Sequence, residues 1–470
     1  MSGVNATGQP VRPRLVLAIC CLSIFIVSLD NTIVNVALPS IRRDLHASIS
    51  ELQWTIDAYT IVLAGLLIAS GSIADRIGRT KIFRLGLVIF SLGSLLCSIA
   101  PSPGALIGFR MLQAVGGSML NPVAMSIIRN TFDDARERAQ AIGIWGAVVG
   151  LSMALGPIAG GALVAGIDWR AIFWVNVPVG VLAIVLTHRF VPESRAARPR
   201  RVDSLGQVLV IVMLGTLVYA IIEGAQASWG SARLTVPAVV SLAAFVALVR
   251  HELRHDEPLI DPRFFRSAPF SGASLIAILA FTALGGFLFL TTLYLQDDRG
   301  LTPLRAGIYT LPMAATAFVA APLSGRLVGR LGARPSLVSG GAALALSSVM
   351  LTGLDGSTRT SWLLLAYFVF GLGFGMVNPP ITNTAVSGMP GDQAGVAAAV
   401  ASTSRLVGIS LGVAIVGAIA VPAAAQLHTG YAHASHPGWW VLTACGLAVV
   451  VLGLLSTTPW ARRTALAVAA

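Results

Sequence analysis

The chain has 470 residues, of which 55% are hydrophobic and only 11% are charged. A soluble globule of this length needs far more polar surface, so the composition excludes that class and indicates an integral membrane protein. The formal net charge is +12, but no basic patch is interleaved with aromatic residues, so nothing in the charge pattern indicates nucleic-acid binding.

Apolar windows of at least about 17 residues predict the membrane spans. The first window is not a cleavable signal peptide, because it is long and lacks a small-residue cleavage site. In chain order, the fourteen predicted spans are 15–37, 53–73, 82–100, 104–128, 139–165, 171–190, 204–223, 234–250, 270–294, 304–328, 336–353, 361–388, 394–424 and 437–458.

An even number of spans places both termini on the same side of the membrane, and the cations decide which side that is. With the N-terminus inside, and with arginines within two residues of a span end counted in the adjoining segment, 23 Lys and Arg residues fall in inner segments and seven in outer segments. Two, Arg110 and Arg405, lie deeper within spans. The positive-inside rule therefore predicts that both termini are cytoplasmic. Most of the net charge is this bias, which faces anionic lipid.

The first two predicted spans each carry a carboxylate. Asp30 lies in the outer half of the first span, where an ionised carboxylate costs roughly 2.5–3.5 kcal/mol unless it faces a cavity or a partner. An ionisable residue at this depth is expected either to be functional or to hold neighbouring helices by hydrogen bonds. Asp57 lies about one turn into the second span, at a comparable depth. It is predicted either to recognise a cationic substrate or to be an interfacial polar residue.

The loop after the second span, Gly71–Lys81, concentrates charge between two apolar runs. Its glycines allow two helix ends to approach, while Asp75 can cap or pair locally and the cations stay in water. The string Gly-Ser-Ile-Ala-Asp-Arg-Ile-Gly-Arg resembles the loop between the second and third spans of the major facilitator superfamily of secondary transporters, which reads Gly-x-x-x-Asp-Arg-x-Gly-Arg. The earlier string Leu29–Pro39 resembles the first-span signature of the 14-span drug:proton antiporter family.

Arg110 lies in the outer half of the fourth span, in the string Arg110-Met-Leu-Gln113-Ala-Val-Gly-Gly. The string resembles the family's Arg-x-x-Gln-Gly-x-Gly motif, with Ala114 in place of the first glycine. A guanidinium at this depth needs an anion nearby, and Asp30 lies at a compatible level. The pair is expected to be either part of proton coupling or a purely structural salt bridge.

The fifth span carries glycines at spacings that clear one helix face, and Pro157 predicts a kink in it. The composite Gly-x5-Gly-Pro-x-x-Gly-Gly, which begins at Gly150, resembles the motif of exporters within the superfamily and implies efflux rather than uptake. The stretch Asp168–Gly180 that follows is again similar to this family.

The second half of the chain carries a degraded repeat of the first loop, Gly325–Arg334, with Gly329 where Asp75 would be. Internal symmetry of this kind predicts two bundles that rock about a site near the bilayer midplane. The resemblance implies an all-α integral membrane protein with the major facilitator fold, built from two six-helix bundles and two extra helices. The predicted units are an N-terminal bundle (1–190), a linker with the two extra helices (191–266) and a C-terminal bundle (267–470).

Two more charges stand in or beside the later spans. Glu223 ends the seventh span and is predicted either to take part in proton coupling or to be a solvated helix end. Arg405 lies near mid-depth of the thirteenth span and is expected either to hold a carbonyl or to line the cavity. The Gln that the family usually shows one or two residues later is absent.

The resemblance implies proton-coupled efflux of amphipathic, cationic drugs or antibiotics across the bacterial inner (cytoplasmic) membrane by alternating access. A dedicated exporter of one endogenous antibiotic, lipid or metabolite is the alternative. An enzyme is not expected, since none of the seven histidines lies well inside a span. The chain has no ATP-binding P-loop, and no cofactor or metal is expected. The expected partners are a drug substrate, protons and membrane lipid, with no nucleic acid, and the chain is expected to be a monomer.

The residues predicted to act fall into three groups. For proton coupling they are Asp30, Arg110 and Glu223; for substrate binding Asp57, Asn35, Tyr59, Gln113, Asn378 and Arg405; and for gating Gly71, Asp75, Arg76, Gly78, Arg79, Gly150, Gly156 and Pro157.

Overall fold

The computed structural model describes residues 12–132, 134–195, 203–224, 231–255, 258, 261–387, 389, 394–427 and 431–469, and every regular element in these ranges is helical. The α-helices are α1 (Pro13–Leu45), α2 (Ile49–Ile77), α3 (Arg79–Ser98), α4 (Pro103–Thr131), α5 (Ala135–Gly166), α6 (Ala171–Trp174), α7 (Asn176–Phe190), α8 (Ser204–Gly224), α9 (Ala232–Glu252), α10 (Ala268–Leu293), α11 (Pro303–Tyr309), α12 (Leu311–Leu331), α13 (Ala333–Met350), α14 (Thr360–Ser387), α15 (Ala394–Leu427), α16 (Tyr431–Ala434), α17 (His436–Leu455) and α18 (Pro459–Ala469). Two shorter turns, η1 (Pro262–Arg266) and η2 (Tyr294–Asp298), flank α10.

Twelve spans in the described part of the chain are long and apolar enough to cross a membrane, and the bent helix α5 brings the number to thirteen. The all-helical, membrane-spanning class that the sequence predicts is therefore confirmed. The number of candidate spans is twelve or thirteen, which does not reach the predicted fourteen.

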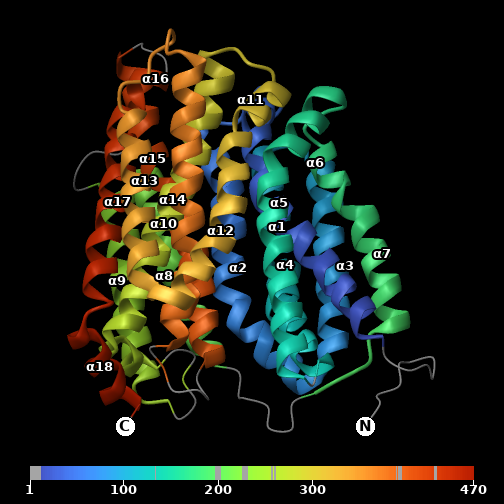
Figure 1. Ribbon diagram of the computed structural model, residues 1–470. Coiled ribbons are helices and arrows are strands. Elements are labelled where there is room, and N and C mark those ends of the chain that lie inside the picture. The colour runs from blue at the N-terminus through green and yellow to red at the C-terminus, as the bar shows by residue number, and fades with distance from the viewer. Residues whose placement is uncertain are drawn as a thin grey trace.

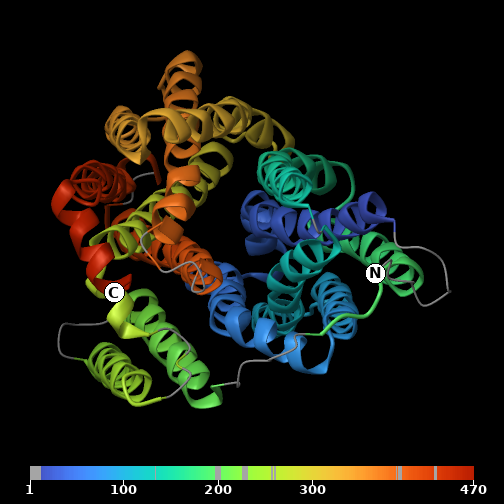
Figure 2. The ribbon, with the colours of Figure 1, turned by 60° about the horizontal axis from the view of Figure 1, so that its bottom comes forward.

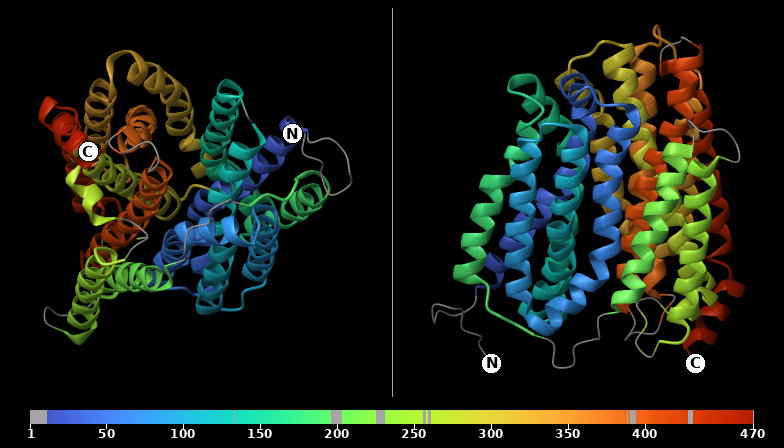
Figure 3. Two further views of the ribbon diagram at one scale, coloured as in Figure 1. Left: turned by 90° about the horizontal axis from the view of Figure 1, so that it is seen from below. Right: turned by 180° about the vertical axis from the view of Figure 1, so that it is seen from behind.

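The helices form two groups that lie side by side (Figure 1). The first group contains α1 to α7 and the second contains α10 to α17. The pair α8 and α9 stands at their common edge, where α8 packs against α2 of the first group and α15 of the second (Figures 2 and 3). Helix α1 begins and α18 ends at the same end of the molecule, which we call the terminal end; the opposite end is the far end.

Local signals in the sequence explain how the first helical hairpin forms. His46, with φ 53°, ends α1 in the left-handed conformation. Ser48 then caps α2: its Oγ accepts the backbone N–H of Glu51, and the Glu51 carboxylate accepts the N–H of Ser48 at 2.7 Å. This capping box starts α2 directly after α1.

Small residues bring α3 and α4 into backbone contact. A Cβ atom placed on Gly93 would lie 2.6 Å from the Cα atom of Gln113, closer than two carbon atoms can approach. Lipid tails are themselves apolar, so burial of apolar side chains does not drive helices together in a membrane. Close packing of small residues drives their association instead. By contrast, Gly108 on α4 is exposed and has no heavy atom within 4 Å of a Cβ position.

The two groups are held together near the far end. There Gln296 Nε2 donates to the carbonyl of Val36 at 2.8 Å, and Arg42 Nη1 lies 3.6 Å from Asp297 Oδ2. Further in, Gln53 Nε2 donates to the carbonyls of Val413 and Ala414 at 3.0 and 3.1 Å. In the half of α5 nearer the terminal end, positions 143, 146 and 150 are glycines with no heavy atom within 4 Å of a Cβ position. The two groups therefore interlock at the far end, and α5 is loosely packed toward the terminal end.

We predict that Gly93→Ala lowers the free energy of unfolding by about 1–3 kcal/mol, because the added methyl group must push α3 and α4 apart. The matched variant Gly108→Ala should change it by less than about 0.5 kcal/mol. Thermal unfolding of the two purified variants in one detergent, followed by tryptophan fluorescence, measures both. Equal unfolding temperatures for the two would show that close backbone approach does not stabilise this helix pair.

Candidate functional site

Five polar side chains from four helices meet inside the first group. Asp30 comes from α1, Ser94 from α3, Arg110 and Gln113 from α4, and Asn176 from α7. Arg110 is 1% exposed and the other four are 0% exposed. We call this set the Asp30 cluster. Its members sit among apolar helices, so their polar atoms must find bonds within the set or with nearby backbone carbonyls.

The carboxylate of Asp30 is surrounded by donors. Arg110 Nη1 donates to Oδ2. Oδ1 accepts two amide bonds, from Gln113 Nε2 at 2.9 Å and from Asn176 Nδ2 at 3.0 Å. A buried ion pair is tolerated when further hydrogen bonds satisfy its remaining lone pairs, and the two amides supply them here.

Arg110 reaches beyond Asp30 to a second helix. Its Nη1 also donates to Gln113 Oε1 at 2.7 Å, and its Nε donates to the carbonyl of Thr55 on α2 at 3.3 Å. Its Cζ atom lies 4.0 Å from the centroid of the Tyr59 ring and 5.8 Å from that of Phe173. Cation–π contact with a desolvated guanidinium adds to the ion pair. The cluster therefore links α1, α2, α4 and α7.

Sequence reasoning did not assign a role to Asn176 or Ser94. Asn176 joins the cluster because its Nδ2 bridges Asp30 and the hydroxyl of Ser94, 3.0 Å from each. Ser94 in turn donates to the carbonyl of Phe173 at 2.9 Å. One feature of the sequence could have identified Asn176: it is an amide side chain within an otherwise apolar predicted span, where a polar residue is costly.

Two residues predicted to bind substrate, Tyr59 and Gln113, contact Arg110. Gln113 is fully buried between Asp30 and Arg110. Tyr59 lies under the guanidinium, and its buried hydroxyl has no hydrogen-bond partner among the described residues.

A small cavity lies between the two groups of helices. Its volume is about 20 Å³, which is room for a single water molecule. Asn35, one of the predicted substrate-binding residues, lines it. The full lining is Asn31, Thr32, Asn35, Ile56, Met153, Leu284, Gly285, Leu288, Ile409 and Val413.

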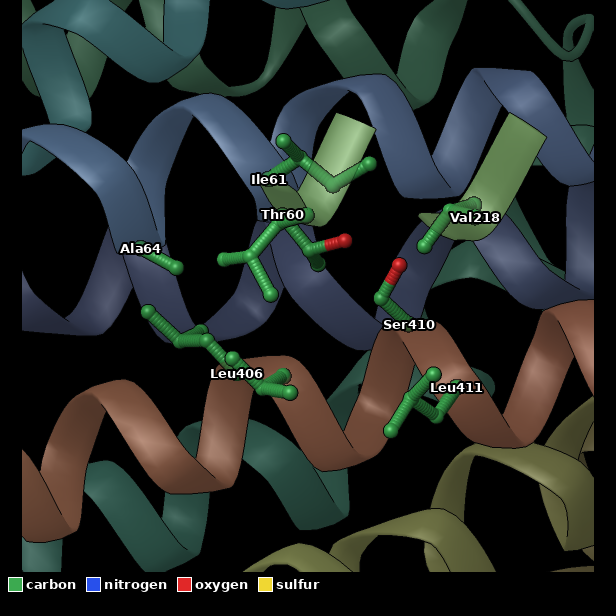
Figure 4. Close-up of a pocket in the computed structure, with 9 residues that line it drawn as sticks. Thr60, Ile61, Ala64, Val218, Leu406, Ser410 and Leu411 are labelled. Carbon is green, nitrogen blue, oxygen red and sulfur yellow. The ribbon is translucent and has the colours of Figure 1, made fainter. Parts of the chain in front are cut away.

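Asp57 faces a different space. It lies between Thr55 and Tyr59, which both contact Arg110, so it stands at the level of Asp30 but on another side of α2. Both carboxylate oxygens are buried with no hydrogen-bond partner in the described part of the chain, and they face the hydroxyl of Ser410 on α15. Ser410 also borders a second cavity of about 10 Å³ between α2, α8 and α15 (Figure 4).

The other predicted polar residues lie apart from the cluster. Arg405 Nη2 donates to Thr382 Oγ1 on α14 at 2.5 Å, and Asn378 lies one helical turn before Thr382. Glu223, at the far end of α8, accepts Ser50 Oγ at 2.5 Å and Trp54 Nε1 at 3.2 Å. Glu223 thus ties α8 to α2.

The predicted gating loop is tied to the segment that follows α7. Asp75 Oδ1 pairs with Arg79 Nε at 2.8 Å, one turn further on. Gly78 has a φ of 136°, which a residue with a side chain would rarely adopt, and the Glu193 carboxylate lies against it. Glu193 accepts the first N–H groups of α3, from Thr80 at 3.0 Å and Lys81 at 3.2 Å. Gly71 and Arg76 of the same loop motif are on α2, and the side chain of Arg76 is exposed.

The glycines of α5 differ in how closely neighbouring helices approach them. A Cβ atom on Gly156 would collide with Thr32 on α1, so Gly156 permits this close contact, whereas Gly150 has open space. The carbonyl of Pro157 lies against Gly307 of α11 in the second group. Close to this proline, α5 bends by 40°.

Nothing in the described residues forms a metal site: no group of three or more His, Cys, Asp or Glu side chains is placed to hold an ion. The arrangement instead offers one buried ion pair, two small cavities between helices of the two groups, and two ionisable side chains, Asp57 and Arg405, that form no ion pair with the described residues.

Residues 20–413 match the model of the Major Facilitator Superfamily. Multidrug resistance protein Stp of Mycobacterium tuberculosis (strain CDC 1551 / Oshkosh) is 38% identical over 402 residues, which cover 85% of this chain and 74% of that protein. Tetracenomycin C resistance and export protein of Streptomyces glaucescens is 36% identical over 416 residues, covering 88% and 77%. Puromycin resistance protein pur8 of Streptomyces alboniger is 36% identical over 449 residues, covering 93% and 88%.

Solved structures show the same fold at low sequence identity. A bacterial homolog to the human lysosomal transporter Spinster, crystallised in an inward-facing and unoccupied conformation, is 19% identical with a TM-score of 0.67, over 97% of this chain and 98% of that one. The peptide transporter POT in complex with sulfate is 17% identical with a TM-score of 0.66, over 96% of this chain and 95% of that one.

We predict that Asp30→Asn and Arg110→Gln each lower the free energy of unfolding by about 3–5 kcal/mol, since each leaves one buried charge without its counter-ion. The double variant Asp30→Asn/Arg110→Gln should recover most of that loss, because two neutral amides can share the same hydrogen bonds. Unfolding of the three purified variants in detergent gives the coupling between the two positions. Losses that simply add would mean that the two side chains do not depend on each other.

Proposed function

Because this chain belongs to the Major Facilitator Superfamily, we propose that it exports amphipathic, cationic drugs or antibiotics in exchange for protons, by alternating access. Its relatives support the direction of transport and the substrate class, since they are named as multidrug resistance, antibiotic resistance and export proteins. The observation that carries proton coupling is the buried pair of Asp30 and Arg110.

Proton binding and an intact Asp30 cluster exclude each other. Every oxygen of Asp30 accepts a bond from Arg110, Gln113 or Asn176. A protonated carboxyl has lost its charge and has become a donor itself, so it no longer balances the guanidinium. Arg110 must then find another acceptor, and the helices that it links must shift. The cluster is therefore an element with two arrangements that a proton can bias.

The same helices carry the cluster and the cavity, which provides the coupling to substrate. On α1, Asp30 belongs to the cluster while its neighbour Asn31 lines the cavity. On α2, the carbonyl of Thr55 accepts Arg110 while Ile56 lines the cavity. A shift of either helix that follows protonation changes the cavity as well. If the substrate fits only one of the two arrangements, a bound proton changes the affinity for the substrate, and the substrate changes the affinity for the proton by the same factor.

Alternating access follows from the contacts between the two groups. The bonds of Gln296, Arg42 and Gln53 close the far end, and all of them join the two groups. We propose that these contacts separate when the far end opens. Asp57, which faces Ser410 across the seam between α2 and α15, would then meet water and could take up a proton or contact the substrate.

We further propose that the terminal end faces the bacterial cytoplasm and that the far end faces outward. The support is the excess of Lys and Arg in the predicted inner segments. The proposed organisation has an N-terminal bundle (1–190), a linker with two additional helices (191–266) and a C-terminal bundle (267–470). Helix α13, with 18 residues, packs against α14 and α17 through Gly340 and Gly341, and counting it would bring the spans to fourteen.

The remaining predicted residues take supporting roles in this proposal. Asn35 contacts the substrate from the cavity wall. Glu223 is a second candidate proton acceptor, since its carboxylate lies near the far end against Ser50 and Trp54. The Asp75–Arg79 pair and the glycines of α5 allow the bundles to rock.

A dedicated exporter of one antibiotic is the second candidate. Several relatives are named for a single compound, among them tetracenomycin C and puromycin, which favours it. The range of drugs that the chain exports separates the two candidates. A pump-deficient bacterium that makes a multidrug pump should resist several unrelated cationic drugs. A bacterium that makes a dedicated exporter should resist a single structural class.

The coupling prediction concerns the neutral pair Asp30→Asn/Arg110→Gln, reconstituted in vesicles with an imposed pH gradient. The wild type should release protons when ethidium is added and should transport ethidium against its gradient. The neutral pair should bind ethidium within about threefold of the wild type, yet move no protons in response, because no titratable group remains at the cluster. A pH-sensitive dye inside the vesicles measures this.

The matched control is Glu137→Gln, which removes an exposed carboxylate from α5 and should leave coupling intact. If the neutral pair moves as many protons per ethidium as the wild type, Asp30 does not carry the proton. The role would then pass to Asp57 or Glu223.

A further inference from the structure

Arg405 is a half-buried cation on α15 of the second group, and no carboxylate of the described residues pairs with it. Its one hydrogen bond runs from Nη2 to the neutral hydroxyl of Thr382, and its Nε is buried with no partner in the described part of the chain. A guanidinium within a membrane span is costly without an anion, so this arrangement is incomplete.

Helical spacing places Arg405 beside the cavity between the two groups. Ile409 and Val413, one and two turns further along α15, both line that cavity. Residues four apart share one face of a helix, so Arg405 continues the same stripe toward the terminal end. The ring of Phe281 lies 5.8 Å from its Cζ atom and stands one turn before Leu284 of the cavity wall on α10.

Helix α14 adds a polar and an aromatic group to the same place. Asn378 lies one turn from Thr382, and its Oδ1 is buried without a partner among the described residues. Phe374 lies one turn earlier still and packs edge-to-face on Phe281, with ring centroids 5.1 Å apart. The surroundings of Arg405 thus combine unused hydrogen-bonding groups with two aromatic rings.

The first group offers no negative charge to this cavity. Its contribution to the lining is Asn31, Thr32, Asn35, Ile56 and Met153, none of which is charged. The carboxylate of Asp30 is occupied by Arg110. Asp57 faces Ser410, which stands five residues beyond Arg405 on α15 and therefore points to another side of that helix.

We propose that Arg405 binds an ionised acidic oxygen of the transported molecule, a carboxylate, phenolate or enolate carried on an aromatic skeleton. The planar guanidinium can donate parallel hydrogen bonds to such a group, and the rings of Phe281 and Phe374 can pack against the skeleton. This inference rests on the proposed function and extends its substrate class: zwitterions with both a cationic and an acidic group are bound better than the corresponding cations.

Two dyes that differ in one group test the proposal. Rhodamine 110 carries a free carboxylate, and rhodamine 123 is its methyl ester, with the same rings and the same cationic charge on them. Fluorescence anisotropy of each dye with the purified full chain in lipid nanodiscs gives the two dissociation constants. The wild type should bind rhodamine 110 roughly tenfold more tightly than rhodamine 123, or better.

The variants separate charge recognition from structure. Arg405→Gln should weaken rhodamine 110 roughly tenfold and leave rhodamine 123 within about twofold, because only the free acid uses the guanidinium. Arg405→Lys keeps the charge but cannot donate two parallel hydrogen bonds, so the preference for rhodamine 110 should fall to about threefold. Arg463→Gln removes an exposed arginine on α18 and should change neither constant.

The proposal is overturned if the wild type has no preference for rhodamine 110, or if Arg405→Gln weakens both dyes equally. If Arg405→Gln gives no folded protein, Arg405→Lys decides, and a preference as large as that of the wild type contradicts the proposal. Failure of the proposed function looks different: wild-type vesicles would then transport neither dye, whereas failure of this inference leaves transport of rhodamine 123 intact.

Discussion

A charged side chain inside an apolar helix bundle must find its counter-charge and its hydrogen bonds in that bundle, since lipid supplies neither. The Asp30–Arg110 pair finds its counter-charge inside the first group, and Gln113 and Asn176 donate to the other oxygen of Asp30. These four side chains come from α1, α4 and α7, so their bonds also hold the three helices in position relative to one another. The pair is also sensitive to protonation. One proton on Asp30 removes the negative charge that balances Arg110 and turns one accepting oxygen into a donor.

The chain places this sensitive element directly behind the cavity. Adjacent residues of α1 serve the cluster and the cavity, and the same is true of α2. Glycines then allow α5 to lie against α1 at Gly156, while its first half has open space around Gly143, Gly146 and Gly150. The contacts between the two groups gather at the far end, so a change in the first group can be transmitted to the second as a rigid-body motion.

The sequence predicted the class of fold and the level of Asp30 and Arg110, because apolar windows and intramembrane charges follow directly from the cost of burying polar groups in lipid. It could not predict on which side of a helix a residue lies. Asp57 stands at the level of Asp30 but faces Ser410, and Tyr59 and Gln113 face the cluster rather than a cavity. These placements depend on the rotation of α2 and α4, which is decided by packing contacts such as Gly93 against Gln113. Asn176 could not be predicted for the same reason. Its hydrogen bond to Asp30 depends on the placement of α7 beside α1.

The central claim is that the protonation state of the Asp30 cluster sets which end of the protein is open. Spin labels on Gly104→Cys and Gly356→Cys, two exposed far-end positions on opposite groups with free space around them, report the far-end distance by electron paramagnetic resonance. In a background without the four native cysteines, lowering the pH should lengthen this distance in the wild-type cluster. In the neutral pair Asp30→Asn/Arg110→Gln the distance should not respond to pH. A shift of equal size in both proteins would contradict the account.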